Sequence, residues 1–129
     1  MGENIKYLGI DWGEKRIGLA LGDSETGLAL PFKVVGDLPE LLKVIDVEKI
    51  DEIVLGEPKK MSGEAANDSW QGFFKDLRSA VSIPVHLLDE RMSSLEADAL
   101  PGEKGDKAAR DSVAAMIILQ SYLDGLLLQ

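Results

Sequence analysis

The stretch YLGIDWGEKRIGLALGD, residues 7–23, decides the fold. Its apolar residues predict two strands, over 7–11 and 17–21, and the charged, glycine-containing turn between them favours a β-hairpin. Asp11 stands at the end of the first strand, where an apolar run meets solvent. Because an unpaired charge beside apolar residues is costly, this position indicates a carboxylate that has a partner. The hairpin thus predicts the start of a sheet and a candidate functional acid at its edge.

Further strands and helices are predicted after the hairpin. Residues 28–35 predict a third strand, in which Pro31 suits a sheet edge. Asp37 can cap a helix that has Pro39 in its first turn and apolar residues at helical spacing as far as Ile50. The remaining pattern predicts strands over 53–56 and 85–88, a helix over 64–80, a short helix capped by Ser93 or Ser94, and a last helix over 107–123.

This order of elements predicts the fold class. Three strands in succession, followed by strands that alternate with helices, predict an α/β protein with a five-stranded mixed sheet and helices on both faces. A length of 129 residues predicts a single domain, 1–129. Functional sites in such sheets lie at the carboxyl ends of the parallel strands, which is where Asp11 is expected.

Composition excludes several classes of protein. The chain has no cysteine, which excludes disulfides and thiolate metal sites, and its one histidine, His86, cannot build a His-rich zinc site. No apolar run approaches the roughly 18 residues of a membrane span, and no secretory leader is recognisable. The sequence therefore predicts a cytoplasmic protein that does not bind membranes. The net charge of −9 argues by itself against binding to nucleic acid.

Three acids stand at the ends of predicted elements. Asp11 ends the first strand, Glu90 follows the strand over 85–88, and Asp111 lies near the start of the last helix. Each has a purely structural alternative. Asp11 can begin an Asx turn, Glu90 can form an ion pair with Arg91, and Asp111 can be stabilised by the helix dipole in the first helical turn. If the three converge, a hard divalent cation relieves their mutual repulsion. Two such ions clamp the attacking and leaving oxygens of a phosphodiester.

Four blocks of the sequence together resemble a known family. They are GIDWGEKRIGLALGD (9–23), IVLGEPKKMSGE (53–64), LLDERMSSLEA (87–97) and ARDSVAAMIILQSYL (109–123), and they cover nearly the whole length. In this order they resemble the YqgF/RuvX family of Holliday junction resolvases. The resemblance implies a ribonuclease H-like fold and places the family's catalytic, metal-binding acids on Asp11, Glu90 and Asp111. It implies a bacterial cytoplasmic nuclease with Mg²⁺ or Mn²⁺, as two ions, that resolves junctions or matures the 5′ end of small-subunit ribosomal RNA.

The chain departs from the family pattern in two blocks. Where the family reads glycine, an apolar residue and proline, this chain has Glu57, followed after Pro58 by Lys59 and Lys60. The usual pair of threonines after arginine is replaced by two serines, which keep the hydroxyls. These differences bear on substrate preference more than on metal binding.

Several Lys and Arg residues lie in or beside the loops of the predicted site, although the net charge of the chain is negative. Gly13 would let a phosphate approach the backbone, although it can equally be a plain turn residue. If the loops share one rim, a basic collar surrounds the acids; the alternative is ordinary solvated charge. This collar predicts weak, salt-sensitive binding of branched DNA or structured RNA. Its members are Lys15, Arg16, Lys59, Lys60, Arg91, Lys104, Lys107 and Arg110.

Two other functions compete with the nuclease. The acidic charge and Glu57 also suit a non-catalytic nucleic-acid-binding or ribosome-assembly module. The Asp-x-Gly after a strand also resembles the phosphate loop of actin and sugar kinases, a fold that needs two lobes and a longer chain. Symmetric cleavage would need a twofold dimer, so both a monomer and a homodimer are open. The apolar last helix can either offer a surface to a partner or belong to the core.

Overall fold

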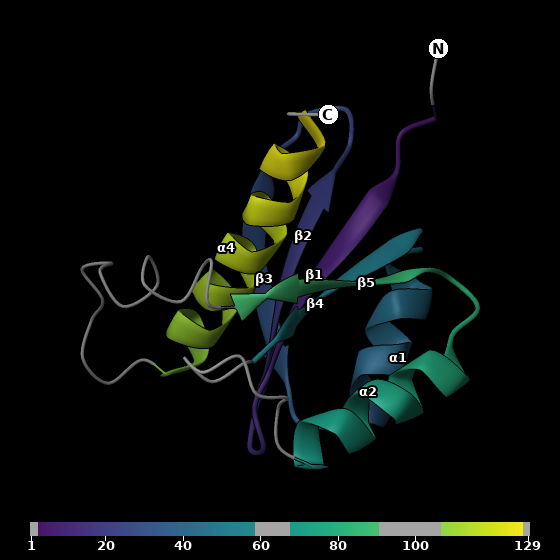
Figure 1. Cartoon of the computed structure of the whole chain (residues 1–129), viewed down its shortest axis with the longest axis vertical. Coiled ribbons are helices and arrows are strands. Elements are labelled where there is room, and N and C mark those ends of the chain that lie inside the picture. The colour runs from purple at the N-terminus through teal and green to yellow at the C-terminus, as the bar shows by residue number, and fades with distance from the viewer. Residues whose placement is uncertain (1–2, 59–67, 91–106, 128–129) are drawn as a thin grey trace.

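The computed structural model describes residues 3–58, 68–90 and 107–127. Within them, five strands form one mixed sheet in the order β3-β2-β1-β4-β5. Three helices in the described ranges accompany the sheet (Figure 1). The strands are β1 (Lys6–Trp12), β2 (Ile17–Asp23), β3 (Ala29–Val35), β4 (Glu52–Glu57) and β5 (Val85–Asp89), and the helices are α1 (Leu38–Val47), α2 (Asp68–Ala80) and α4 (Lys107–Leu127).

The strand pairing confirms the predicted hairpin and the predicted mixed sheet. β1 pairs antiparallel with β2, and β2 pairs antiparallel with β3, whereas β1, β4 and β5 run parallel. β3 lies at the edge, as Pro31 indicated, because an edge strand tolerates a residue without a backbone N–H. The carboxyl ends of the three parallel strands therefore meet at one edge of the sheet, next to the turn between β1 and β2.

Helices cover both faces of the sheet, as predicted. Figure 1 shows α4 along one face and α1 with α2 on the other. Side chains alternate along each strand, so Leu8 and Ile10 of β1 pack in the core beneath α1 and α2, while Tyr7 packs in the core beneath α4. The two apolar layers hold the carboxyl edge of the parallel strands in a fixed place.

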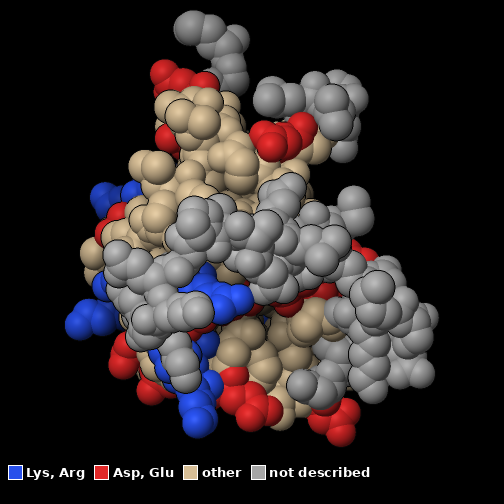
Figure 2. Space-filling view, turned by 90° about the vertical axis from the view of Figure 1, so that its left-hand side faces the viewer, with Lys and Arg blue, Asp and Glu red and all other residues tan. Residues whose placement is uncertain are grey.

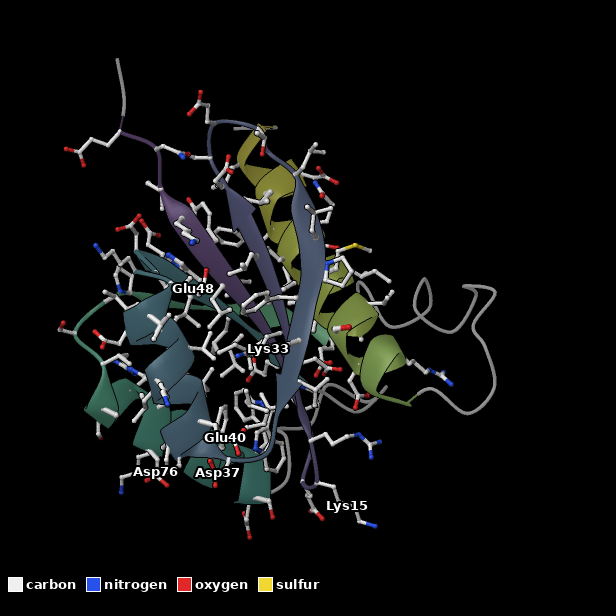
Figure 3. The ribbon with its side chains drawn as sticks, turned by 180° about the vertical axis from the view of Figure 1, so that it is seen from behind. Lys15, Lys33, Asp37, Glu40, Glu48 and Asp76 are labelled. Carbon is white, nitrogen blue, oxygen red and sulfur yellow. The ribbon has the colours of Figure 1, made fainter. Side chains whose placement is uncertain are left out.

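The predicted cap of α1 is present, but the helix ends earlier than predicted. The Asp37 side chain accepts a hydrogen bond of 3.0 Å from the Glu40 backbone N–H, and both residues lie at the start of α1 in Figure 3. The apolar spacing predicted a helix as far as Ile50, and this is wrong. Lys49 adopts a positive φ of 54°, which ends the helix while Ile50 still reaches the core.

The last helix belongs to the core. Ile118 and Leu119 are buried against the sheet, and α4 extends beyond the predicted end to Leu127. The Gln120 side chain accepts from the Ala29 backbone N–H at 2.9 Å and donates to the Gly27 carbonyl at 2.9 Å, which fastens α4 to the start of β3. Of the two alternatives for this helix, the core is therefore the correct one for its buried face.

Some predicted elements lie outside the described residues. These are the short helix after Ser93 or Ser94 and the first turn of the helix predicted from Glu64. In the ranges that are described, no helix has both the length and the apolar character of a membrane span.

Candidate active site

Asp11 and Glu90 meet at the carboxyl edge of the parallel strands. Asp11 is the penultimate residue of β1, Glu90 follows the last residue of β5, and their carboxyl groups are joined by a hydrogen bond. β4 lies between their two strands. Two of the three predicted acids, which are remote in sequence, are therefore brought together by the parallel pairing.

Gly56 of β4 makes room for this pair. A Cβ on Gly56 would lie 3.0 Å from Cδ of Glu90 and 2.6 Å from Cδ1 of Ile118, so any larger residue would push the Glu90 carboxyl away. Sequence reasoning used Gly56 only as the end of a strand. No pattern in the sequence could reveal its role, because the contact joins residues of different elements.

Because Asp11 and Glu90 are buried and would repel each other if both were charged, the two carboxyl groups share one proton. Burial raises the pKa of Glu90 to about 8, with further contributions from the charge of Asp11, its hydrogen bond to Asp11, and the charge of Asp89. Burial also raises the pKa of Asp11, although the hydrogen bond from Glu90 opposes this rise. At neutral pH Glu90 therefore carries the shared proton and donates it to the Asp11 carboxylate.

Asp111 lies near the pair but binds a different partner. The Arg16 side chain donates from Nε to Oδ2 of Asp111 at 2.8 Å, which joins the turn after β1 to the first turns of α4. The charge of Asp111 contributes to the raised pKa of Asp11, so the two carboxylates are within electrostatic range. Within the described part of the chain, no three acidic or histidine side chains are grouped closely enough to hold one metal ion.

A close approach of helix to strand places Asp111. A Cβ on Gly18 of β2 would collide with the backbone carbonyl of Asp111. Glycine at position 18 therefore lets the start of α4 lie directly on β2, beside Arg16. This second glycine was also missed by sequence reasoning, for the same reason as Gly56.

The donor set fits a hard divalent cation. Carboxylate oxygens are the ligands that Mg²⁺ prefers, and a cation would replace the proton that Asp11 and Glu90 now share. Asp111 can add a third carboxylate only if its ion pair with Arg16 is loosened or shared. The arrangement thus suits metal binding that is coupled to proton release.

The structure describes some of the residues predicted to contact nucleic acid, and the others lie outside the described ranges. Lys15 points outward from the tip of the β1–β2 hairpin (Figure 3), and Arg110 is exposed at the start of α4. Arg16, predicted to contact the nucleic-acid backbone, forms an ion pair with Asp111. The Gly13 N–H donates to the Arg16 carbonyl at 2.9 Å, which favours its role as a turn residue. Lys59, Lys60, Arg91 and Lys104 lie outside the described residues, and Lys107 is the first residue of α4.

Charges of both signs surround the site. On the face shown in Figure 2, basic side chains gather in the lower part of the view with acidic side chains beside them. The described part of this face therefore carries charges of both signs.

The fold is similar to that of two solved resolvase structures. The Thermus thermophilus RuvC structure in complex with a Holliday junction substrate superposes with a TM-score of 0.58 at 16% identity, over 95% of this chain and 96% of that one. The fowlpox virus resolvase bound to Holliday junction DNA superposes with a TM-score of 0.57 at 12% identity, over 95% and 99% of the two chains. The ribonuclease H-like, resolvase-type fold is therefore confirmed.

The sequence then places the chain within that class. Residues 5–125 match the sequence model of the family described as RuvX, Holliday junction resolvase, and the chain belongs to this family. A protein of Maridesulfovibrio salexigens named "Putative pre-16S rRNA nuclease" is 39% identical, over 92% of this chain and 98% of its own length. A protein of the same name from Anaeromyxobacter sp. is 37% identical, over 94% and 98% of the two chains.

Proposed function

We propose that this chain is a metal-dependent endonuclease that hydrolyses phosphodiester bonds in structured nucleic acid. Membership of the resolvase family and the names of its relatives support a substrate that is either a four-way DNA junction or precursor 16S ribosomal RNA. The observation that carries the proposal is the Asp11–Glu90 pair at the carboxyl edge of the parallel strands. Its catalytic and metal-binding residues in this proposal are Asp11, Glu90 and Asp111.

The chemistry follows from the chain's own residues. When Mg²⁺ or Mn²⁺ is bound, as two ions in our proposal, the metal supplies charge neutralisation at the phosphate and activation of water. Asp11 and Glu90 would hold the cation, which would take the place of their shared proton. Asp111 would provide the third carboxylate once its ion pair with Arg16 is loosened or shared.

Phosphate contacts come from the rim of the site. Lys15 and Arg110 are exposed on the two segments that flank the acids, and Lys107 begins the same helix as Arg110. Lys59, Lys60 and Arg91, which lie outside the described residues, are further candidates for phosphate contacts in this proposal. Because such contacts release counterions, binding should weaken as salt rises. We place the activity in the cytoplasm, in a single domain that acts as a monomer or a homodimer.

Replacing Asp11 tests the proposal. Asp11→Asn keeps the shape but lowers the negative charge of the pair, so cleavage of a four-way junction or of precursor 16S ribosomal RNA with Mg²⁺ or Mn²⁺ should fall at least about 100-fold. Asp46→Asn, at an exposed position on α1, is the matched control and should retain full activity. If the unmodified protein cuts neither substrate while a control nuclease cuts both, the proposal is refuted.

A second candidate is a non-catalytic module for binding nucleic acid or assembling ribosomes. The Arg16–Asp111 ion pair favours it, because it commits one of the three acids to a structural bond. Complementation in cells separates the two candidates. Full function of Asp11→Asn would favour the module, and loss of function with intact folding would favour the enzyme.

A further inference from the structure

A groove lies between α1 and the edge strand β3, on the face of the sheet that α1 and α2 cover. It has a volume of about 340 Å³, and none of the described residues that line it belongs to the candidate active site. In Figure 3, Lys33 of β3 lies between the levels of Glu48 and Glu40, which stand near opposite ends of α1. The lining residues include Phe32, Lys33, Glu40, Lys43, Val47 and Glu48.

Large apolar side chains are exposed around this groove. Leu30 of β3 is 67% exposed, Val47 of α1 is 63% exposed, and Phe32 is 37% exposed. Leu30 is paired in register with Leu21 of β2, whose side chain packs against the core beneath α1 and α2. Because residues opposite each other in an antiparallel pair point to the same face, Leu30 lies on the face of the groove. Apolar side chains that gather in this way indicate an interaction surface, whereas a single exposed one does not.

The backbone edge of β3 is poorly suited to adding another strand. Pro31 has no N–H to donate, and the register between β2 and β3 shifts at Leu19 and Ala20. Prolines and bulges in edge strands are features that discourage a further strand from joining a sheet. The surface therefore offers side chains more than backbone groups to a partner, and a folded protein surface fits it better than an extended peptide.

The charged side chains that line the groove are balanced in sign. Lys33 and Lys43 are positive, whereas Glu40 and Glu48 are negative. Lys6 donates to Oε1 of Glu48 at 3.1 Å, which fixes this carboxylate at the rim of the groove. Two copies of a chain with a net charge of −9 repel each other on average, but this balanced groove escapes that repulsion. A twofold axis can place the lysines of one copy against the glutamates of the other, so the groove is complementary to itself.

We propose that a second copy of this chain docks on this groove and forms a twofold dimer in which α1 and β3 of the two copies face each other. Leu30 and Val47 of each copy become buried between the copies, and the lysines and glutamates pair around them. Every contact of such an interface is made twice. The proposal concerns a surface separate from the acids, so it does not depend on the proposed nuclease activity.

Sedimentation velocity in EDTA, without substrate, tests the dimer. Between about 5 and about 500 µM, the unmodified protein should shift from monomer to dimer. Leu30→Thr keeps a residue that favours strands but removes apolar surface, and it should raise the dimer Kd at least about tenfold because the position occurs twice in the interface. Leu87→Thr is the matched control, since Leu87 is an exposed leucine of the other edge strand, β5, and it should leave the Kd unchanged.

Two charge variants test the twofold arrangement. Lys33→Glu combined with Lys43→Glu makes the groove acidic, and Glu40→Lys combined with Glu48→Lys makes it basic. Each variant alone should stay monomeric, because like charges then face each other across the axis. An equimolar mixture of the two should form a heterodimer, because each groove then meets one of opposite charge. Circular dichroism checks that every variant is folded.

An unmodified protein that stays monomeric at every concentration refutes the proposal. A dimer whose Kd is unchanged by Leu30→Thr, or changed equally by Leu87→Thr, also refutes it, because the two copies would then meet through another surface. The proposal fails as well if the mixture of charge variants stays monomeric, or if either variant alone dimerises as readily as the unmodified protein. None of these measurements involves cleavage, so the dimer can fail while the nuclease proposal stands, and the reverse.

Discussion

Replacing Glu90 by glutamine should remove a pH dependence of stability that the acid pair imposes. In the folded protein Glu90 has a pKa of about 8, well above its ordinary 4.5, because it is buried beside Asp11. The folded state therefore binds more protons than the unfolded state between these two pH values. Stability from this group is complete below about pH 4.5 and is lost as pH rises through about 8. Glu90→Gln cannot ionise, and its amide can still donate to Asp11.

The size of the effect follows from the pKa. Each pKa unit corresponds to about 1.4 kcal/mol, so between pH 5 and pH 9 the unmodified protein should lose about 4 kcal/mol relative to Glu90→Gln. The raised pKa of Asp11 acts in the same direction. At pH 5 the two proteins should be similar in stability, and at pH 9 the variant should be clearly the more stable.

Urea unfolding followed by circular dichroism, in EDTA and at five pH values from 5 to 9, measures this difference. Glu14→Gln, at an exposed position in the hairpin, makes the same chemical change away from the pair and should follow the unmodified protein. Adding Mg²⁺ at pH 9 should stabilise the unmodified protein more than Glu90→Gln. Parallel stability curves for the unmodified protein and Glu90→Gln would refute the shared proton.

Three further predictions concern the packing around the site. Gly18→Ala should destabilise the fold by about 2 kcal/mol in urea unfolding, because its Cβ would collide with the Asp111 carbonyl, and it should lower cleavage; unchanged activity would contradict the placement of α4. Arg16→Met should change the free energy of unfolding by less than about 1 kcal/mol. It should lower the Mg²⁺ concentration needed for half-maximal cleavage, because it frees Asp111. A higher Mg²⁺ concentration for half-maximal cleavage would show that Arg16 assists metal binding. Trp70→Phe should cost about 1 kcal/mol of stability through the lost hydrogen bond to Gly56, and thermal unfolding decides this.

The architecture was predictable because its signals are local. Strand residues such as those of the hairpin, the cap at Asp37 and the edge position of Pro31 each depend on near neighbours in sequence. The early end of α1 was not predictable, because the apolar spacing continues to Ile50 while the positive φ of Lys49 breaks the helix. Periodicity describes which face is buried, and it does not describe the backbone angle at which a helix stops.

For the candidate site, the sequence could predict that Asp11 and Glu90 lie close together. Placing Asp11 and Glu90 at strand ends follows from topology, since parallel strands share one carboxyl edge. The bond from Arg16 to Asp111 joins residues 95 positions apart and depends on how closely α4 approaches β2. The sequence predicted that Arg16 contacts the nucleic-acid backbone, because a cation beside an acidic site can bind a phosphate. In the structure, Arg16 forms an ion pair with the Asp111 carboxylate.

The candidate site needs α4, so the place of this helix at the end of the described chain decides when the site can form during synthesis. α4 follows every other described element in sequence, and it carries Asp111 as well as the apolar layer on one face of the sheet. During translation it leaves the ribosome after all of them, so the nascent polypeptide holds Asp11 and Glu90 before the helix that completes their surroundings. A chain interrupted before residue 107 would lack Asp111 and the apolar layer of α4, so it could not assemble the three acids of the proposed site.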